Sequence, residues 1–430
     1  MAGSSERQWD SDAAEGDSPR GVWDLHRLAR EGRWREISAH CRDDPPWVGS
    51  DPALSLTARA YRALALAKLG SLGEASEELK AAGAEGAWTD EGEGWSELAP
   101  PLPPGGSPRS LLCTELGPSA YPSDTLDVPY AMRWLGARLP GLAGDAASSA
   151  DRLHLLSRLC ARRASAASAA GDDPMRSLWL RRMARASIEC AASHCKLGRH
   201  RAALRELDAL LAEQPRCVEG WRQAAFAQLL AGDRPAAERS LTRAVEVAEG
   251  KGLGEEGGLI DDDAGGLAGA FGPVRSYGNS GGMLFTGSGR LRVPSFSPSF
   301  GFAPLPVANP PAAQVETHAK ALMLLLKRSF AAASLEYAGL LAAPETDPVA
   351  VGNGALCAAY QQRLEAAAAQ LEEAFRRDGE RLTIEPLIQT LAQLYEMGAT
   401  PKFQRAKREL AAWAASNAPD DFDLSYTRVP

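Results

Sequence analysis

The chain has 430 residues, of which 45% are hydrophobic and 24% are charged, and its formal net charge is −8. This acidic balance argues against a nucleic-acid partner, and no apolar run reaches the ~18 residues of a membrane helix. The seven cysteines are odd in number and scattered along the chain, which indicates reduced thiols in a cytosolic protein rather than a disulfide framework.

The N-terminal part of the chain predicts a short disordered segment followed by helical hairpins. Residues 1–20 are polar and acidic, so we expect them to be disordered. The apolar positions in 22–41 predict two short helices around Gly32. Residues 54–82 predict a longer hairpin with its turn at Gly70.

The stretch 184–249 contains two copies of one pattern that lie 34 residues apart. The matching pairs are Ala191 and Ala225, Gly198 and Gly232, Ala203 and Ala237, and Leu207 and Leu241. Each copy predicts a helix, a glycine turn and a second helix, with small residues where the two helices approach closely. This period and residue order are the signature of the tetratricopeptide (TPR) repeat, and the hairpin around Gly70 has the same spacing. We expect Trp221, at the large position of the second copy, to be a packing residue.

Residues 251–310 interrupt the repeats, because 26 of these 60 residues are Gly, Ser or Pro. We expect a flexible insertion that lengthens one junction between repeats, since the entropic cost of a loop grows slowly with its length. The repeats then resume, because Ala321, Ala333 and Tyr337 recur 34 residues later as Ala355, Ala367 and Leu371. A last helix pair with a polar outer face would cap the array.

The predicted fold is therefore all-α: a right-handed α-α superhelix, or TPR solenoid, of helical hairpins with a disordered insertion. The predicted division is a disordered N-terminus (1–20), N-terminal hairpins with a TPR-like unit (21–141), TPR repeats (142–249), a Gly/Ser/Pro-rich flexible insertion (250–312), and C-terminal TPR repeats with capping helices (313–430).

Four features beyond the general repeat signature resemble the subunit 12 family of the transport protein particle (TRAPP), a vesicle-tethering complex. They follow the family's order from about residue 54 to 415. They are 64–70 (LALAKLG), 128–133 (VPYAMR) followed by 151–154 (DRLH), 349–357 with Asn353 inside it, and 391–397 with Tyr395 and Glu396. Two departures are a longer insertion and Gln362, which stands where a turn glycine is common.

The resemblance implies a structural subunit of a hetero-oligomeric TRAPP complex in traffic between the endoplasmic reticulum and the Golgi. Its partners would be other TRAPP subunits. Nucleotide exchange on a Rab-family GTPase belongs to other subunits, so the link to that GTPase would be indirect. The chain would be cytoplasmic and peripheral at these membranes, through the complex at most.

No stretch predicts a catalytic, cofactor or metal site. Residues 278–282 (GNSGG) resemble the nucleophile loop of trypsin-like proteases, but they lie in the insertion, which cannot hold a base against a serine. Cys190 and His194 are four residues apart and share a predicted helix face, with Cys195 adjacent and Cys217 in the next hairpin. Cys190 occupies a core-facing repeat position, where a free cysteine behaves as a small hydrophobe. We therefore expect no enzyme activity and no metal.

The candidate partner-docking residues are Arg176, Arg181, Arg182 and Arg185, together with Asn353. The four arginines crowd one predicted helix. They form either a solvated face whose long stems cover the repeat below, or a docking patch for an acidic partner or membrane surface.

Asn353 belongs to an alternative function, a co-chaperone or other adaptor that binds a peptide in its concave groove. The TPR subset that clamps a C-terminal carboxylate needs a Lys and an Asn on one inner helix and an Asn on the next. Asn353 sits suitably for such a clamp, but His318 and Leu322 occupy the expected partner positions.

Overall fold

The computed structural model describes residues 22–42, 52–82, 128–250, 312–341, 347–398 and 400–418, and the single residues 420, 422 and 427. The expectations for residues 1–20, the 278–282 loop and nearly all of the 250–312 insertion lie outside these residues. Within the described residues there are sixteen helices and no strand, which confirms the prediction of an all-α solenoid.

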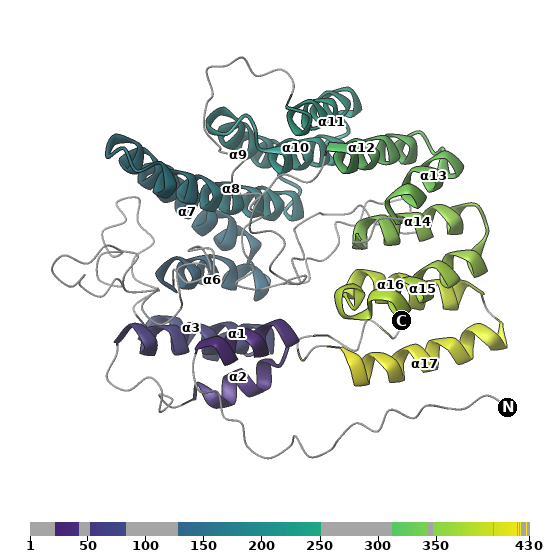
Figure 1. The fold of residues 1–430 in the computed structure, drawn as a ribbon, viewed down its shortest axis with the longest axis horizontal. Coiled ribbons are helices and arrows are strands. Elements are labelled where there is room, and N and C mark those ends of the chain that lie inside the picture. The colour runs from purple at the N-terminus through teal and green to yellow at the C-terminus, as the bar shows by residue number, and fades with distance from the viewer. Residues whose placement is uncertain are drawn as a thin grey trace.

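The helices follow one another as hairpins along the chain (Figure 1). Their bounds are α1 Val22–Glu31, α2 Trp34–His40, α3 Pro52–Lys68, α4 Leu72–Ala81, α6 Val128–Leu142, α7 Ala146–Ala169, α8 Asp173–Lys196, α9 His200–Glu213, α10 Val218–Leu230, α11 Arg234–Ala248, α12 Ala312–Leu326, α13 Phe330–Leu341, α14 Pro348–Tyr360, α15 Leu364–Leu382, α16 Glu385–Gly398 and α17 Pro401–Asn417.

Several helices begin where the sequence provides a capping side chain. Asp172, Asp233 and Asp347 precede α8, α11 and α14, and each carboxylate accepts a hydrogen bond from a backbone N–H of the first turn. Each of these helices also has a proline in its first two positions, where a missing N–H costs nothing. Local chemistry therefore sets these helix starts.

The turns inside the repeats share one left-handed backbone geometry. The φ angles are +70° at Gly198 and +84° at Gly232, and two residues with side chains adopt the same region, Arg328 at +57° and Gln362 at +61°. At Gln362 the next N–H, that of Arg363, donates to the Ala358 carbonyl at 3.0 Å. The matching bond from Arg199 to His194 measures 2.8 Å. Gln362 thus keeps the geometry that glycine adopts elsewhere.

Small side chains lie buried where the two helices of each hairpin cross. In five of the hairpins, the alanine five residues after the turn is buried, and so is the large side chain four residues later. The five pairs are Ala75 and Leu79, Ala203 and Leu207, Ala237 and Leu241, Ala333 and Tyr337, and Ala367 and Leu371, with exposed fractions between 0% and 5%. The 34-residue pattern therefore marks the helix crossings, as the sequence predicted.

The stack continues across the insertion. α11 and α12 are separated by 251–311 in the chain, yet they pack together. Leu241 of α11 shares an apolar cluster with Leu322 and Met323 of α12, and Val247 shares another with Val315. The junction between these repeats is thus closed by direct helix contact, as expected for an insertion that only lengthens the connection.

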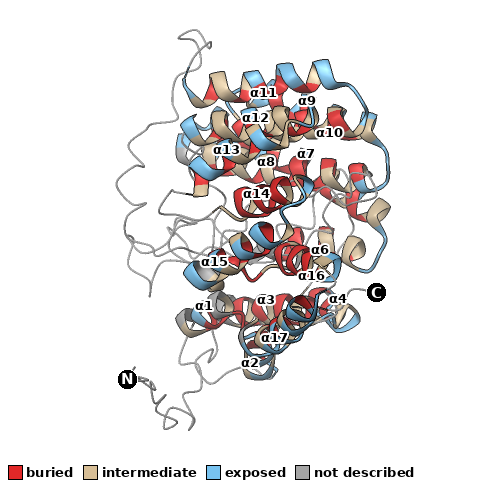
Figure 2. Cartoon of the chain, turned by 90° about the vertical axis from the view of Figure 1, so that its right-hand side faces the viewer, coloured by how far each residue is buried: buried red, intermediate tan, exposed pale blue. Residues whose placement is uncertain are grey.

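The helices form an arc whose two ends approach each other (Figure 1). α14, which lies between α13 and α15 in the arc, is largely buried, whereas α17 exposes one face (Figure 2). After α17 the backbone N–H of Asp420 donates to the Gly32 carbonyl at 3.0 Å, and Arg35 N–H donates to Asp420 Oδ2 at 3.0 Å. These bonds join the C-terminal end of the arc to its first hairpin.

Candidate functional site

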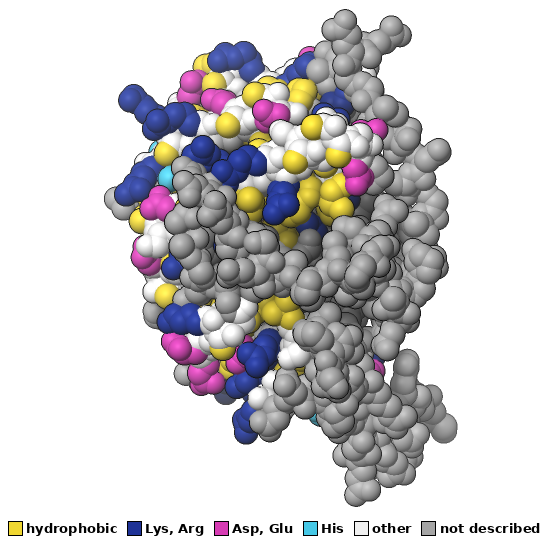
Figure 3. Space-filling view, turned by 90° about the vertical axis from the view of Figure 1, so that its left-hand side faces the viewer, with side chains coloured by type: hydrophobic (Ala, Val, Ile, Leu, Met, Phe, Trp, Pro, Cys, Tyr) yellow, Lys and Arg dark blue, Asp and Glu magenta, His cyan; other side chains and the backbone are white. Residues whose placement is uncertain are grey.

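The four arginines predicted as a docking patch lie on α8, but they do not share one environment. Arg176 is exposed, and Arg181 is half-buried with one guanidinium nitrogen 3.2 Å from Ser177 Oγ. Arg162 and Arg163 on α7 are also exposed. Lys and Arg side chains on this side of the molecule are mixed with Asp and Glu (Figure 3). The solvent-facing part of the cluster therefore consists of Arg176, with Arg181 beside it.

Arg182 is buried, so the expectation that it lies on a solvated or docking face is wrong. Its side chain is 1% exposed, and its guanidinium carbon lies 4.6 Å from the ring centroids of both Tyr130 and Trp179. The two rings meet edge to face at 85° and surround the cation. The physical reason is helix rotation: residue 182 points about 100° away from residue 181, toward α6.

Arg185 also turns inward and joins a buried ion-pair group. Its guanidinium lies 4.0 Å from the Trp134 ring centroid and its Nε lies 3.6 Å from Glu189 Oε1. Arg138 of α6 approaches the same carboxylate, with Nε at 2.9 Å from Oε2. Burial lowers the pKa of Arg138, and the Glu189 charge opposes that shift. The Arg138 and Arg185 guanidinium groups therefore share the buried Glu189 carboxylate between α6 and α8. Arg185 thus helps to pack these two helices together.

Asn353 is 3% exposed and lies in a buried polar group between α12, α13 and α14. Its Nδ2 donates to Tyr337 Oη at 3.1 Å, while its Oδ1 has no partner within the described residues. Nearby, His318 Nε2 lies 2.5 Å from Asp347 Oδ2. Burial alone would raise the pKa of Asp347, but the hydrogen bond and charge of His318 hold it below its usual value. The expectation that Asn353 faces a ligand carboxylate is therefore wrong, because helix packing covers it.

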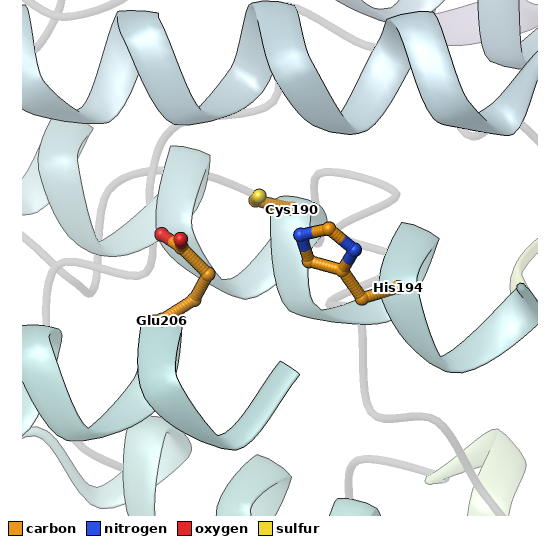
Figure 4. Close-up of side chains that lie close together, drawn as sticks. All are labelled: Cys190, His194 and Glu206. Carbon is orange, nitrogen blue, oxygen red and sulfur yellow. The ribbon is translucent and has the colours of Figure 1, made fainter. Parts of the chain in front are cut away.

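The cysteine and histidine positions considered for a metal ion separate into two groups. Cys195 packs in the apolar core, and Cys217 Sγ accepts a hydrogen bond from Gly220 N–H at 3.3 Å at the start of α10. Cys190 and His194 instead face Glu206 of α9 (Figure 4). The ligand atoms of these three residues all lie within 4.8 Å of one another.

The electrostatics of this group come mainly from burial. Burial, followed by the charges of Glu206 and Asp151, raises the pKa of the Cys190 thiol, and the thiol lies 3.3 Å from the Ala150 carbonyl, to which it donates. Burial also lowers the pKa of His194. The sequence signal for Cys190 and His194 was their four-residue spacing, but nothing local pointed to Glu206, which comes from the next helix.

Within the described residues, no helix combines the length and the apolarity needed to cross a membrane.

Comparison with known proteins assigns no family to this chain. No family model matches the chain, and no curated protein matches it. Among solved structures, the crystal structure of the TPR domain of P58(IPK) aligns over 96% of this chain and 96% of its own, with 11% sequence identity and a TM-score of 0.21. A TM-score this low does not establish a shared fold, so the fold assignment rests on the helices of this chain.

Proposed function

We propose that this chain is a non-catalytic scaffold subunit of a TRAPP vesicle-tethering complex that acts in traffic between the endoplasmic reticulum and the Golgi. The observation that carries the proposal is the ordered set of family-like segments. They lie on α3, on α6 and α7, on α14 and on α16, and so they span the whole helical arc.

These segments are mostly packing residues of the solenoid. In α3, Leu64, Ala65 and Ala67 are each no more than 5% exposed. In α14, every residue from 350 to 355 is buried. A family resemblance carried by such positions supports a shared scaffold, since they define how the hairpins stack and not what the surface binds.

A helical solenoid acts by presenting a long preformed surface to partners. Two exposed apolar side chains stand out as anchors for such contacts, Leu335 on α13 at 76% exposure and Met397 on α16 at 57%. Arg176 adds an exposed positive charge on α8. In this proposal, neighbouring subunits bury these side chains, and no turnover is involved.

The test is capture of the tagged chain from native cytosol, followed by mass spectrometry of the bound proteins. We expect other TRAPP subunits at stoichiometric amounts and co-migration with them on size exclusion. Recovery of a heat-shock chaperone without TRAPP subunits would replace the proposal with the peptide-binding adaptor. Recovery of neither would remove the TRAPP assignment.

Two surface variants locate the contact within that experiment. Leu335→Asp and Arg176→Glu alter exposed side chains, so each leaves the fold intact. We expect at least one of them to reduce recovery of TRAPP subunits. Full recovery with both variants would assign the interface to other surfaces while leaving the scaffold proposal in place.

A further inference from the structure

The neighbours of Cys190 and His194 in space form a more complete ligand set than the sequence indicates. Cys190 and His194 lie one helical turn apart on α8 and face Glu206 of α9 (Figure 4). Glu206 Oε1 also lies 2.8 Å from Nδ1 of His154 on α7. Two consecutive helices, α8 and α9, therefore bring one thiol, one imidazole and one carboxylate together, and His154 of α7 contacts the carboxylate.

We propose that Cys190, His194 and Glu206 form a binding site for a divalent transition-metal ion of the zinc type, with His154 holding the Glu206 carboxylate. Sulfur, nitrogen and oxygen donors of these kinds are the ligands that zinc uses in proteins. This inference is independent of the proposed function, and it revises the expectation that the chain binds no metal.

The distances suit a site that closes around an ion. Zinc holds its ligand atoms at about 2.0 to 2.3 Å, which places the ligands of a tetrahedral site roughly 3 to 4 Å apart. Here the Cys190, His194 and Glu206 ligand atoms lie within 4.8 Å of one another, so small side-chain rotations bring them to that spacing.

The surroundings also favour an ion over a purely structural role. The Cys190 side chain is buried, whereas His194 and Glu206 are half-buried, so the group lies at the edge of the core. His194 has a buried Nδ1 without a hydrogen-bond partner, and its ring makes no side-chain hydrogen bond within the described residues. A buried ring nitrogen without a hydrogen-bond partner is costly unless it gains a ligand, and a metal ion would supply one.

The charges balance once the ion is bound. The dication coordinates one thiolate, one carboxylate and one neutral imidazole, so the site has no net charge and is compatible with burial. On binding, the Cys190 S–H bond breaks, its proton leaves to solvent and a metal–sulfur bond forms. The hydrogen bond from the thiol to the Ala150 carbonyl is lost in the same step.

The experiment uses the full chain, carried on a tag without histidines and stripped of metal with a chelator. Titration with Co(II) reports thiolate coordination directly through a sulfur-to-metal charge-transfer band, and Zn(II) then displaces the cobalt. We expect one ion per chain. Glu206→Gln and His194→Gln should each weaken binding by at least the roughly 10–100-fold typical of losing even an outer-shell partner, and Cys190→Ser should abolish the charge-transfer band.

Cys217→Ser is the matched control. Cys217 was a candidate ligand by sequence but lies at the start of α10, where serine is a favoured capping residue, so this variant should fold and bind metal normally. Circular dichroism of each metal-free variant checks folding. If Cys190→Ser does not fold, the metal affinities of Glu206→Gln and His194→Gln test the proposal instead. Absence of the cobalt band in the wild-type chain, or unchanged binding in Glu206→Gln and His194→Gln, overturns the proposal.

Discussion

Arg182 shows how a single residue departs from the pattern around it. Four arginines in one helix indicate a solvated face, yet the Arg182 side chain is enclosed by the Tyr130 and Trp179 rings. A planar guanidinium is more weakly hydrated than an ammonium and stacks on aromatic rings, which makes its burial tolerable. Charge reversal at this position is therefore a test of stability and not of docking.

We expect Arg182→Glu to lower the free energy of unfolding by about 3–5 kcal/mol, because it leaves an uncompensated anion against two aromatic faces. Arg176→Glu, on the same helix but exposed, should change it by no more than about 0.5 kcal/mol. Urea denaturation followed by circular dichroism measures both. Equal stability of the two variants would show that Arg182 is not enclosed in solution.

Gln362 provides a second test at the residue scale, because it holds a turn geometry that suits glycine. A residue with a side chain loses roughly 1 kcal/mol in the left-handed region. Replacing Gln362 by glycine removes that strain but gives the unfolded chain more freedom. We expect Gln362→Gly to stabilise the protein by up to about 0.5 kcal/mol, the difference between these two effects.

The matched control for Gln362→Gly is Gly198→Gln, which makes the reverse change at the equivalent turn, where φ is +70°. It should destabilise the protein by about 1 kcal/mol. Midpoints of urea unfolding compare the two variants with the parent. Destabilisation by both substitutions would mean that the Gln362 side chain contributes a favourable contact of its own.

At the scale of the element, each helix is stabilised by the side chains that neighbouring helices pack against it. Trp221 of α10 illustrates this, since its side chain packs against two apolar clusters. Its Nε1 donates to the Pro215 carbonyl at 3.0 Å across the loop that precedes α10. The ring is half-buried, which supports the expected packing role but places the site nearer the surface than a core position.

We expect Trp221→Ala to cost about 3 kcal/mol, the lower end of the range for buried tryptophan, because part of the ring stays in contact with water. Trp221→Phe retains most of the packing and loses the hydrogen bond, so it should cost about 1 kcal/mol. Thermal and urea unfolding of the three proteins would separate packing from hydrogen bonding. Unchanged stability combined with lost partner binding would instead assign Trp221 to an interface.

At the scale of the whole molecule, the arc depends on contacts between segments that are distant in the chain. α11 and α12 meet directly although 251–311 separates them. We expect replacement of 251–311 by a ~20-residue Gly/Ser linker, with a root-mean-square span of roughly 25 Å, to leave the thermal midpoint and its cooperativity unchanged. Differential scanning calorimetry tests this. A broad or markedly lower transition would show that the replaced segment packs on the repeats.

The closing contact through Asp420 makes a further prediction at this scale. Removing residues 419–430 deletes the two hydrogen bonds to the first hairpin, so the ends of the arc should separate and the radius of gyration from small-angle scattering should increase. The loss of stability should exceed the roughly 1–2 kcal/mol of the two hydrogen bonds, because Phe422, which packs against the C-terminal apolar cluster, is removed as well. Asp420→Asn is the control: it retains the backbone bond, and its exposed ion pair with Arg35 contributes little. Superimposable scattering curves for parent and truncated chains would contradict this prediction.

Much of the solenoid could be predicted from the sequence because its determinants are local and repeated. Apolar periodicity, proline and aspartate at helix starts, and a turn residue followed five positions later by alanine each act within a few residues of the chain. The all-α hairpins and the buried Ala237 and Ala333 follow directly from these signals. Even the departure at Gln362 was visible, because the repeat frame defined the position where glycine was expected.

The candidate sites could not be predicted in this way, because they depend on how helices are rotated against one another. Whether Arg182 or Arg181 faces α6 is decided by a rotation of about 100° that composition does not encode. Cys190 of α8 meets Glu206 of α9, and Glu206 in turn contacts His154 of α7, so this group needs three helices at once. The bond between Asp420 and Gly32 joins opposite ends of the arc. The sequence by itself thus determined the helices, their turns and their crossings, which are short-range properties. Only the tertiary structure decided which side chains are buried together, since those contacts join residues that no local pattern connects.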